Sequence, residues 1–161
     1  MSYVFSKNFK LPITCLRFFT VYGPYSRKDM AIYKFVSSAL ENKKITLHNS
    51  GNHYRDFTYV SDVVKIIIKL ISKIPKNKIK FELFNIGSGK SIKLINLVKI
   101  IEKKLNKKIN YKKIKIQEGD VFKTHSSIRK IKNYLDLKDH FVSIEKGIEK
   151  YIDWYNDQEN E

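Results

Sequence analysis

Two short runs of apolar and aromatic residues constrain the fold of this chain more than any other feature. Residues 13–19 read Ile-Thr-Cys-Leu-Arg-Phe-Phe, residues 81–86 read Phe-Glu-Leu-Phe-Asn-Ile, and a glycine turn follows each run. Such runs predict strands that are buried within a parallel sheet. Buried parallel strands need neighbours on either side, and the chain offers no other long apolar strand. We therefore expect the two runs to be part of a larger sheet.

The spacing of apolar residues predicts helices between and after these strands. We expect helices over residues 30–42, 63–74, 94–105 and 126–134, and a last helix that Ser143 caps. Shorter strands are expected over residues 45–48, 56–60 and 109–116. The mixed order of elements predicts one α/β domain over residues 1–161.

One of these helices, over residues 63–74, is apolar on nearly every side. Ser61 and Asp62 precede it and supply the side chains that commonly cap a helix start. Pro75 then ends the helix. We expect this helix to be mostly buried.

Composition narrows the class of protein. The chain is 42% hydrophobic and 30% charged, which is ordinary for a globular protein, and no apolar run approaches the roughly 18 residues of a membrane span. The polar, basic start offers no signal peptide, and the single cysteine, Cys15, excludes an internal disulfide, so we expect a cytoplasmic protein. Metal-ligand spacing is missing from the four histidines, His48, His53, His125 and His140.

The net charge of +16 raises the alternative of a basic nucleic-acid-binding module. Lysines concentrate at positions 103, 104, 107, 108, 112, 113 and 115. Stacking aromatics or a groove-reading helix usually accompany such a patch, and this stretch offers only Tyr111. We favour a solvated lysine face over a nucleic-acid footprint.

Several motifs then occur in a characteristic order. Residues 16–24 read Leu-Arg-Phe-Phe-Thr-Val-Tyr-Gly-Pro, residues 27–30 read Arg-Lys-Asp-Met, and residues 55–62 read Arg-Asp-Phe-Thr-Tyr-Val-Ser-Asp. Phe-Asn-Ile-Gly at 84–87 and Gly-Asp-Val at 119–121 follow. Across essentially its whole length, the chain resembles the carboxyl-terminal part of extended short-chain dehydrogenases/reductases of the NAD-dependent epimerase/dehydratase family. The likeness is greatest to UDP-glucuronate 4-epimerases.

This resemblance implies the last parallel strands of a Rossmann-type sheet together with a small substrate-binding α/β domain. It also implies a UDP-sugar substrate, UDP-glucuronate or UDP-galacturonate, in nucleotide-sugar metabolism for surface polysaccharides. Cofactor contacts would come from Phe18 and Phe19 at the nicotinamide side, although adjacent strand residues point to opposite faces. Substrate contacts would come from Thr20, Arg27, Arg55, Gln117 and Asp120.

The resemblance also gives each substrate contact a role. Arg55 would fork onto the diphosphate, as a guanidinium can, and Asp120 would accept hydrogen bonds from the ribose. Gln117 stands where some relatives have a phosphate-binding arginine, so its contact is weaker. Uracil would lie against residues 30–35 and 45–48. A surface ion pair between Arg55 and Asp56 is the simpler alternative, and Gly119-Asp120 is equally compatible with a plain turn.

The motifs of the family's chemistry are not among the 161 residues. They contain no Gly-x-x-Gly-x-x-Gly turn to hold the NAD pyrophosphate. Tyr3 and Lys7 fit the spacing of the catalytic Tyr-x-x-x-Lys, but Tyr3 lies too close to the strand at 13–19 and matches a later position on the family's catalytic helix. We therefore expect no catalytic residue in this chain, no binding of NAD by it alone, and a separate amino-terminal Rossmann half as a candidate partner.

Two readings remain beside the truncated epimerase. A nucleotide-sugar dehydratase or decarboxylase of the same family would share most of these motifs, because the residues that separate the reactions lie mainly in the other half. The Arg-Lys-Asp-Met at 27–30 favours the glucuronate epimerase. The basic nucleic-acid-binding module is the alternative from a different class.

Overall fold

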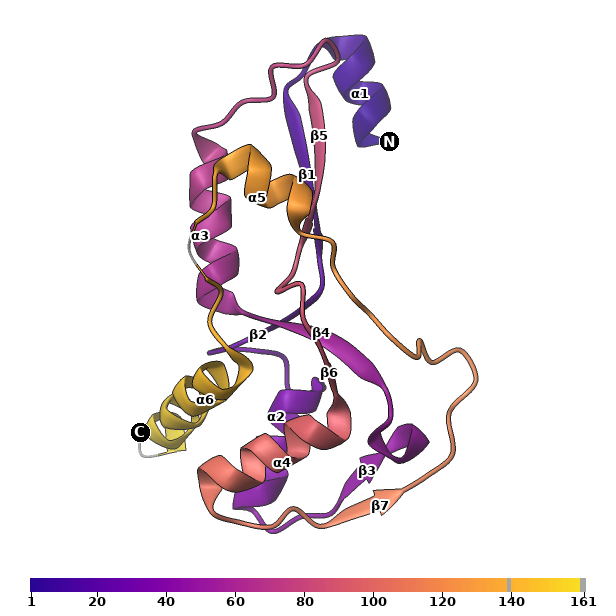
Figure 1. Ribbon diagram of the computed structural model, residues 1–161, viewed down its shortest axis with the longest axis vertical. Helices are drawn as coiled ribbons and strands as arrows, with labels where there is room; N and C mark the ends of the chain where they lie inside the picture. Colours follow the sequence, from indigo (N-terminus) through magenta and orange to yellow (C-terminus); the bar gives the residue numbers. More distant parts are fainter. Residues whose placement is uncertain (139, 160–161) are drawn as a thin grey trace.

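The computed structural model describes residues 1–138 and 140–159 and shows an elongated α/β molecule with two bodies (Figure 1). The first body is built on β1 (Ile13–Phe18) and β5 (Phe81–Ile86), and the second surrounds β2 (Thr20–Tyr22), β4 (Tyr54–Tyr59) and β6 (Ser91–Lys93). The two long strands predicted from the sequence are thus confirmed.

In the first body, β1 and β5 pair directly with each other in parallel, from Ile13 opposite Phe81 to Phe18 opposite Ile86. The crossover between them contains α3 (Val60–Ile71), which packs on the same face of the pair as α5 (Arg129–Leu135). Helix α1 (Ser2–Phe9) lies across the opposite face, where the ring of Tyr3 meets Phe81 edge to face at 5.5 Å.

The second body is closed around a larger core. Strand β4 is central, with β2 parallel on one side and β6 antiparallel on the other. Helices α2 (Ala31–Leu40), α4 (Leu94–Leu105) and α6 (Ile144–Glu159) surround this core. Strand β3 (Ile45–Leu47) leads into the 3₁₀ turn η1 (His48–Gly51) and pairs in parallel with β7 (Tyr111–Lys113). Residues 114–128 then return along the outside toward α5 (Figure 1).

Most predicted elements are present with shifted ends. The helices at 30–42 and 94–105 are confirmed as α2 and α4, and Ser143 caps α6 by accepting a hydrogen bond at Oγ from the Lys146 amide, N···O 3.3 Å. The strand expected over residues 109–116 is shorter, because only the three residues of β7 find a partner strand in β3.

The capping role of Asp62 and the burial of its helix were predicted wrongly. Helix α3 begins at Val60, and no side chain caps it. Asp62 lies in the first turn and accepts a hydrogen bond from the Val142 amide instead, N···O 2.8 Å. One side of α3 is exposed, with Ile68 and Ile71 at 61% and 76% exposure.

The outer side of β1 is also uncovered. Strand β1 pairs only with β5 within the described parts of the chain, and the ring of Phe18 at its end is 51% exposed. Val64, Ile68 and Ile71 are also exposed, and they lie at positions i, i+4 and i+7 of α3, which is one helical stripe. A free strand edge together with an exposed apolar helix face agrees with the expected piece of a larger sheet.

Candidate substrate-binding site

A pocket of about 610 Å³ opens in the second body between α2, β3, the start of β4 and the returning segment 114–128. Three substrate-binding candidates that are far apart in the sequence line it together, namely Arg55, Gln117 and Asp120. The stretches expected to hold the uracil also line it, through Ala31 and Phe35 of α2 and through β3. The structure therefore brings most of the predicted binding surface into one cavity.

Strand β4 positions Arg55 at this pocket. Arg55 pairs with Ile92 of β6 in the antiparallel ladder, and its Nη1 donates a hydrogen bond to the Tyr54 carbonyl oxygen, N···O 2.9 Å. No ion pair joins Arg55 to Asp56 among the described residues, because successive strand residues point to opposite faces. The alternative of a surface ion pair between them is therefore wrong.

Asp56 has a structural role that the sequence did not reveal. Its carboxylate is fully buried and accepts hydrogen bonds from the amide and hydroxyl of Ser88 at 2.9 and 2.7 Å. It also accepts from the amide and hydroxyl of Ser126 at 2.8 and 2.6 Å, and from the Gly89 amide at 3.2 Å. These contacts around the Asp56 carboxylate form a junction between β4, the turn at residues 87–89 and Ser126. A Cβ at Gly87 would collide with Ser126 Oγ, so the junction needs glycine at position 87.

This junction determines where the returning segment runs. Ser126 lies near the end of the segment that carries Gln117 and Asp120, so the Asp56 carboxylate ties that segment to β4. Further along, the Tyr54 amide donates to the Phe122 carbonyl at 2.9 Å and the Thr124 amide donates to the Tyr54 carbonyl at 3.1 Å. The Asp120 amide donates a hydrogen bond to the Gln117 carbonyl, N···O 3.1 Å, and closes a turn. Asp120 therefore both forms a turn and lines the pocket, as the two alternatives for this residue predicted.

The other predicted site residues lie outside this cavity. Arg27 is exposed and forms a two-point ion pair with Asp29, at 3.0 Å from Nε and 2.6 Å from Nη2. Asp29 itself lines the pocket, so Arg27 lies close to its rim. Thr20 begins β2 opposite Phe57, and Phe19 donates its amide to the Ile86 carbonyl at 3.0 Å. Phe18 and Phe19 therefore lie at the end of the first body rather than in the pocket.

The pocket has a positive lining that suits an anion. Lys34, Lys44 and Arg55 line it against the carboxylates of Asp29 and Asp120. The pKa of Asp29 lies below its ordinary value, chiefly because the Arg27 side chain donates a hydrogen bond to it. Two imidazoles, His48 and His53, line the same cavity. His48 belongs to the range 45–48 that was expected to lie against the uracil, whereas His53 was missed because it was tested only for metal-ligand spacing.

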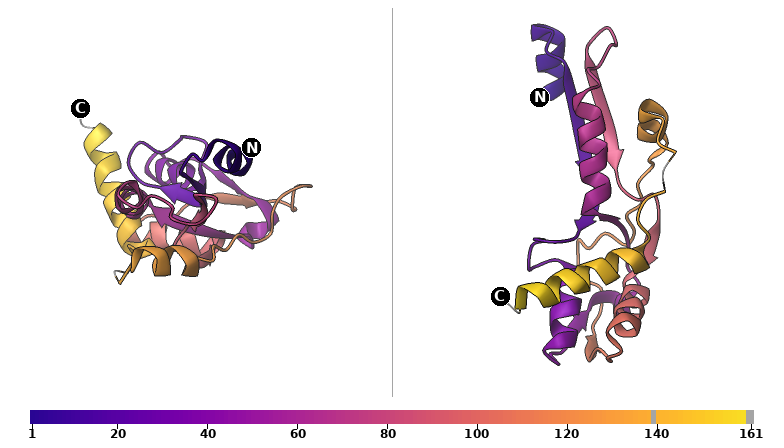
Figure 2. Two further views of the ribbon diagram at one scale, coloured as in Figure 1. Left: turned by 90° about the horizontal axis from the view of Figure 1, so that it is seen from above. Right: turned by 90° about the vertical axis from the view of Figure 1, so that its left-hand side faces the viewer.

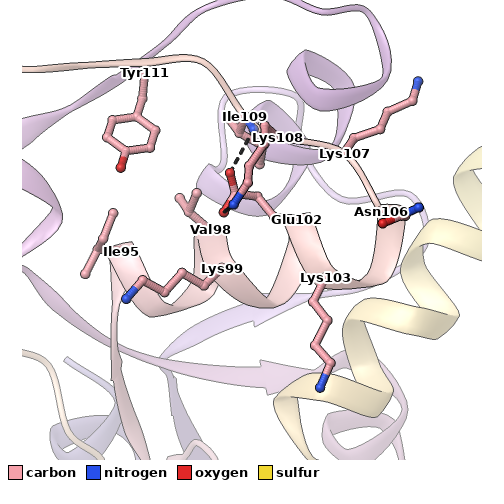
Figure 3. A pocket seen from close by; sticks show the side chains of 10 residues that line it. All are labelled: Ile95, Val98, Lys99, Glu102, Lys103, Asn106, Lys107, Lys108, Ile109 and Tyr111. Atoms are coloured by element: carbon pink, nitrogen blue, oxygen red, sulfur yellow. Dashed lines mark hydrogen bonds and ion pairs between the residues drawn. The ribbon is translucent and has the colours of Figure 1, made fainter.

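A second hollow, of about 670 Å³, lies between α4 and the loop that leads to β7 (Figure 3). Its floor is apolar, with Ile95 and Val98, and lysines surround it. Figure 3 shows Lys103 and Lys107 pointing away from one another, so their charges do not converge on a common point. Glu102 is already engaged by the Ile109 amide at 2.9 Å. This arrangement agrees with a solvated lysine face.

Two classes of feature are missing from residues 1–138 and 140–159. No helix in these ranges is both long enough and apolar enough to span a membrane. The same ranges contain no group of three His, Cys, Asp or Glu side chains placed to hold a metal ion.

Comparison with known proteins gives the family. The model of the NAD dependent epimerase/dehydratase family matches residues 2–87 of the 161. The chain belongs to the NAD dependent epimerase/dehydratase family. The resemblance inferred from the motifs is therefore confirmed, including the likeness to UDP-glucuronate 4-epimerases.

Individual relatives of this family match nearly the whole chain. An uncharacterized protein of Methanocaldococcus jannaschii, MJ1055, is 41% identical over 96% of the chain and 46% of its own length. UDP-glucuronic acid 4-epimerase from Bacillus cereus, solved in complex with UDP-glucuronic acid and NAD, is 32% identical with a TM-score of 0.86, covering 96% of this chain and 48% of its own. MoeE5, solved in complex with the same two ligands, is 26% identical with a TM-score of 0.90, covering 98% and 52%.

The chain spans about half the length of the curated relatives and solved structures that it matches. The two-body α/β architecture, with its parallel strands, is that of the extended short-chain dehydrogenase/reductase fold.

Proposed function

We propose that this chain supplies the UDP-sugar-binding part of an NAD-dependent UDP-glucuronate 4-epimerase. The observation that carries this proposal is the pocket that gathers Arg55, Gln117 and Asp120 between α2 and β3. The bacterial 4-epimerase solved with UDP-glucuronic acid and NAD, which is 32% identical, supports the choice of substrate. We place the reaction in cytoplasmic nucleotide-sugar metabolism that feeds surface polysaccharides.

In this proposal the pocket holds the uridine diphosphate. The Arg55 guanidinium forks onto the diphosphate oxygens, which gives charge-assisted hydrogen bonds worth about 1.5–3 kcal/mol each. Asp120 accepts hydrogen bonds from the ribose, and Gln117 adds a weaker contact to phosphate. Uracil lies between α2 and β3. Thr20 and Arg27 lie toward the sugar, outside the pocket, at the side where the second part of the enzyme would close the site.

NAD supplies the hydride chemistry when it is bound. The 161 residues provide only a few of the contacts that this cofactor needs. They contain no glycine-rich pyrophosphate turn, and from this chain only Phe18 and Phe19 are candidates to contact the nicotinamide side. Tyr3 is a poor candidate base. It lies on α1, where its ring packs against Phe81 of β5, and α1 is at the end of the molecule opposite the α2–β3 pocket (Figures 1 and 2). We assign this chain no catalytic residue.

The NAD-binding part would dock on the uncovered side of the first body. There the free edge of β1 can accept a further parallel strand, and the stripe of Val64, Ile68 and Ile71 can cover that strand. This part of the enzyme lies outside the 161 residues, on the same polypeptide or on a separate one.

Titration with UDP, followed by amide chemical shifts, tests the proposal. We expect weak binding, near about 1 mM or −4 kcal/mol, because the other half of the site does not contribute. Arg55→Ala should remove most of this affinity. As a control that removes two positive charges, Lys112→Ala with Lys113→Ala should change it by less than about twofold, because neither lysine lines the pocket. Loss of binding in the lysine variant, with binding kept in Arg55→Ala, would refute the proposed site.

A further inference from the structure

The loop between β2 and α2, at residues 23–30, brings two charged side chains to the rim of the α2–β3 pocket. Arg27 and Asp29 form a two-point ion pair within this loop, and Asp29 also lines the pocket. Their side chains are 78% and 61% exposed. Such an exposed pair contributes little to stability, and a pair within one loop does not fix where that loop lies. The position of the loop must therefore come from contacts outside it.

Helix α6 supplies such contacts. The ring of Tyr25 meets the indole of Trp154 edge to face, with the ring centroids 5.4 Å apart. Beside it, the hydroxyls of Ser26 and Tyr151 share a hydrogen bond, O···O 3.2 Å. Tyr151 is fully buried, and Trp154 packs against the same core. The loop is thus attached to a part of the second body whose own position is fixed.

The start of the loop is fitted to the same helix. Tyr22 ends β2 directly before the loop and is 2% exposed. A Cβ at Gly147 of α6 would collide with the Tyr22 hydroxyl, so the helix can lie this close to β2 because residue 147 is glycine. Both the beginning and the middle of the loop therefore take their positions from α6.

Tyr25 is an unusual residue for its backbone conformation. Its φ is 59°, in the left-handed region that residues other than glycine, asparagine and aspartate rarely adopt. Tyr25 is 83% exposed, so burial does not offset this backbone strain. A glycine would adopt the same φ without strain but would lack the ring that contacts Trp154. The ring contact is therefore the contribution that a tyrosine makes at position 25.

We propose that Tyr25 and Trp154 are positioning residues of the binding site, and that their ring contact holds the loop at residues 23–30 where Arg27 can reach the sugar of a bound UDP-sugar. This inference rests on the proposed UDP-sugar function and adds the residues that place Arg27. Neither Tyr25 nor Trp154 lines the pocket, so their effect on the ligand passes through the loop.

The loop therefore affects the two parts of the ligand differently. The diphosphate and ribose contacts are assigned to Arg55 and Asp120, which lie on β4 and on the returning segment. The sugar contact is assigned to Arg27, which lies on the loop. Loss of the ring contact should weaken the binding of a UDP-sugar while leaving the binding of UDP nearly unchanged. A general loss of structure would weaken both.

The experiment titrates the 161-residue chain with UDP-glucuronate and, separately, with UDP, and follows amide chemical shifts. Tyr25→Ala removes the ring and should weaken the binding of UDP-glucuronate at least about threefold, which is the scale of one aromatic pair. The same variant should change the binding of UDP by less than about 1.5-fold, because Arg55 and Asp120 lie on other elements. Tyr25→Phe is the matched control, because it keeps the ring, and should bind both ligands as the wild type does.

Trp154 supplies a second readout in the unaltered protein. The chain contains one tryptophan, so the indole N–H gives a single NMR signal. This signal should shift during titration with UDP-glucuronate, with the same dissociation constant that the amides give, because a ligand that contacts Arg27 acts on the loop that Trp154 holds. UDP should leave the indole signal in place.

Four outcomes would overturn this inference and leave the proposed function intact. Two concern Tyr25→Ala: equal weakening of both ligands, which shows a general structural role, or no weakening of either. The third is a loss in Tyr25→Phe as large as that in Tyr25→Ala, and the fourth is an unmoved indole signal while the wild type binds UDP-glucuronate. If the wild-type chain binds neither ligand, the proposed function fails and this inference fails with it.

Discussion

The two bodies of this molecule differ in how completely each buries its own apolar surface. The second body surrounds a core in which Val36, Leu97 and Ile148 are fully buried, and helices close it on several sides. The first body buries Phe84 and Ile86 on one face of a two-stranded sheet, yet leaves Phe18 and one face of α3 exposed. The candidate binding pocket lies in the closed body, whereas the open body presents the surface that we propose a further domain covers.

This difference separates two tasks. A pocket that is formed by one self-contained core can bind part of a ligand without help. Chemistry on that ligand also needs a base and a site for the cofactor, and the 161 residues contain no glycine-rich turn for the cofactor. The comparison therefore predicts binding without turnover.

The largest expected effect is on turnover. The 161-residue chain, with NAD added, should not convert UDP-glucuronate to its 4-epimer, because a base and a cofactor cradle together supply many decades of rate. Product analysis by chromatography over a long incubation measures this. Tyr3→Phe is the informative variant. If the wild-type chain converted UDP-glucuronate and Tyr3→Phe abolished this turnover, the first body would hold a working active site.

The next effect concerns the junction between the bodies. Asp56→Ala removes the acceptor for the amides and hydroxyls of Ser88 and Ser126 and should lower the free energy of unfolding by about 3 kcal/mol or more. Urea denaturation measures the loss. Asp157→Ala, at an exposed position of α6, is the control and should change the free energy by less than about 0.5 kcal/mol. Similar effects of the two variants would contradict the structural role of Asp56.

A smaller effect is expected on the open face of the first body. Ile68→Lys with Ile71→Lys should reduce the binding of a hydrophobic dye and self-association, while changing the free energy of unfolding by less than about 1 kcal/mol. Ile66→Lys places the same change on the buried side of α3 and should unfold the chain or destabilise it severely. Dye fluorescence and sedimentation measure these outcomes. Unchanged dye binding in the double variant would mean that the stripe is not the main exposed apolar surface.

Sequence reasoning predicted the elements well where the periodicity was strong. Helix α4 is an example, because the helical spacing of its apolar residues gave both of its ends although no side chain caps its start. The pairing of β1 with β5 was not stated, because parallel pairing here joins residues 68 positions apart, as in Ile13 opposite Phe81, and leaves no local signal. The exposed side of α3 was missed for a related reason: hydrophobicity indicates that a face is to be covered, not whether its cover lies in the same 161 residues.

The pocket shows a similar division. Arg55, Gln117 and Asp120 were identified by motif resemblance, and the structure brings them to one cavity. The roles assigned to them, and to Thr20 and Arg27, remain predictions. The structural role of Asp56 could not be predicted although the residue belongs to the motif at 55–62, because its burial and its hydrogen-bond partners become visible only in three dimensions.

The smallest expected effect is the pH dependence contributed by Asp62, which links α3 to the start of α6 through the Val142 amide. Burial raises the pKa of this carboxyl above its ordinary value, and the hydrogen bond from Val142 only partly offsets the effect. The folded state therefore binds this proton more tightly than the unfolded state. It follows that the contribution of Asp62 to stability falls as the pH rises from the ordinary value of 3.8 through the raised value.

Asp62→Asn keeps an oxygen that can accept the Val142 hydrogen bond and removes the buried charge. It also removes a favourable interaction with the amino-terminal end of α3, worth about 0.3–1 kcal/mol, so the net gain in unfolding free energy at pH 7 should stay below about 1 kcal/mol. The gain should shrink as the pH falls below 4, where the carboxyl becomes protonated in both states. Urea denaturation at pH 7 and pH 3.5 measures it, with Asp157→Asn as the exposed control. A variant that is less stable at pH 7 by more than 1 kcal/mol would show that the charge of Asp62, rather than its acceptor oxygen, holds the two bodies together.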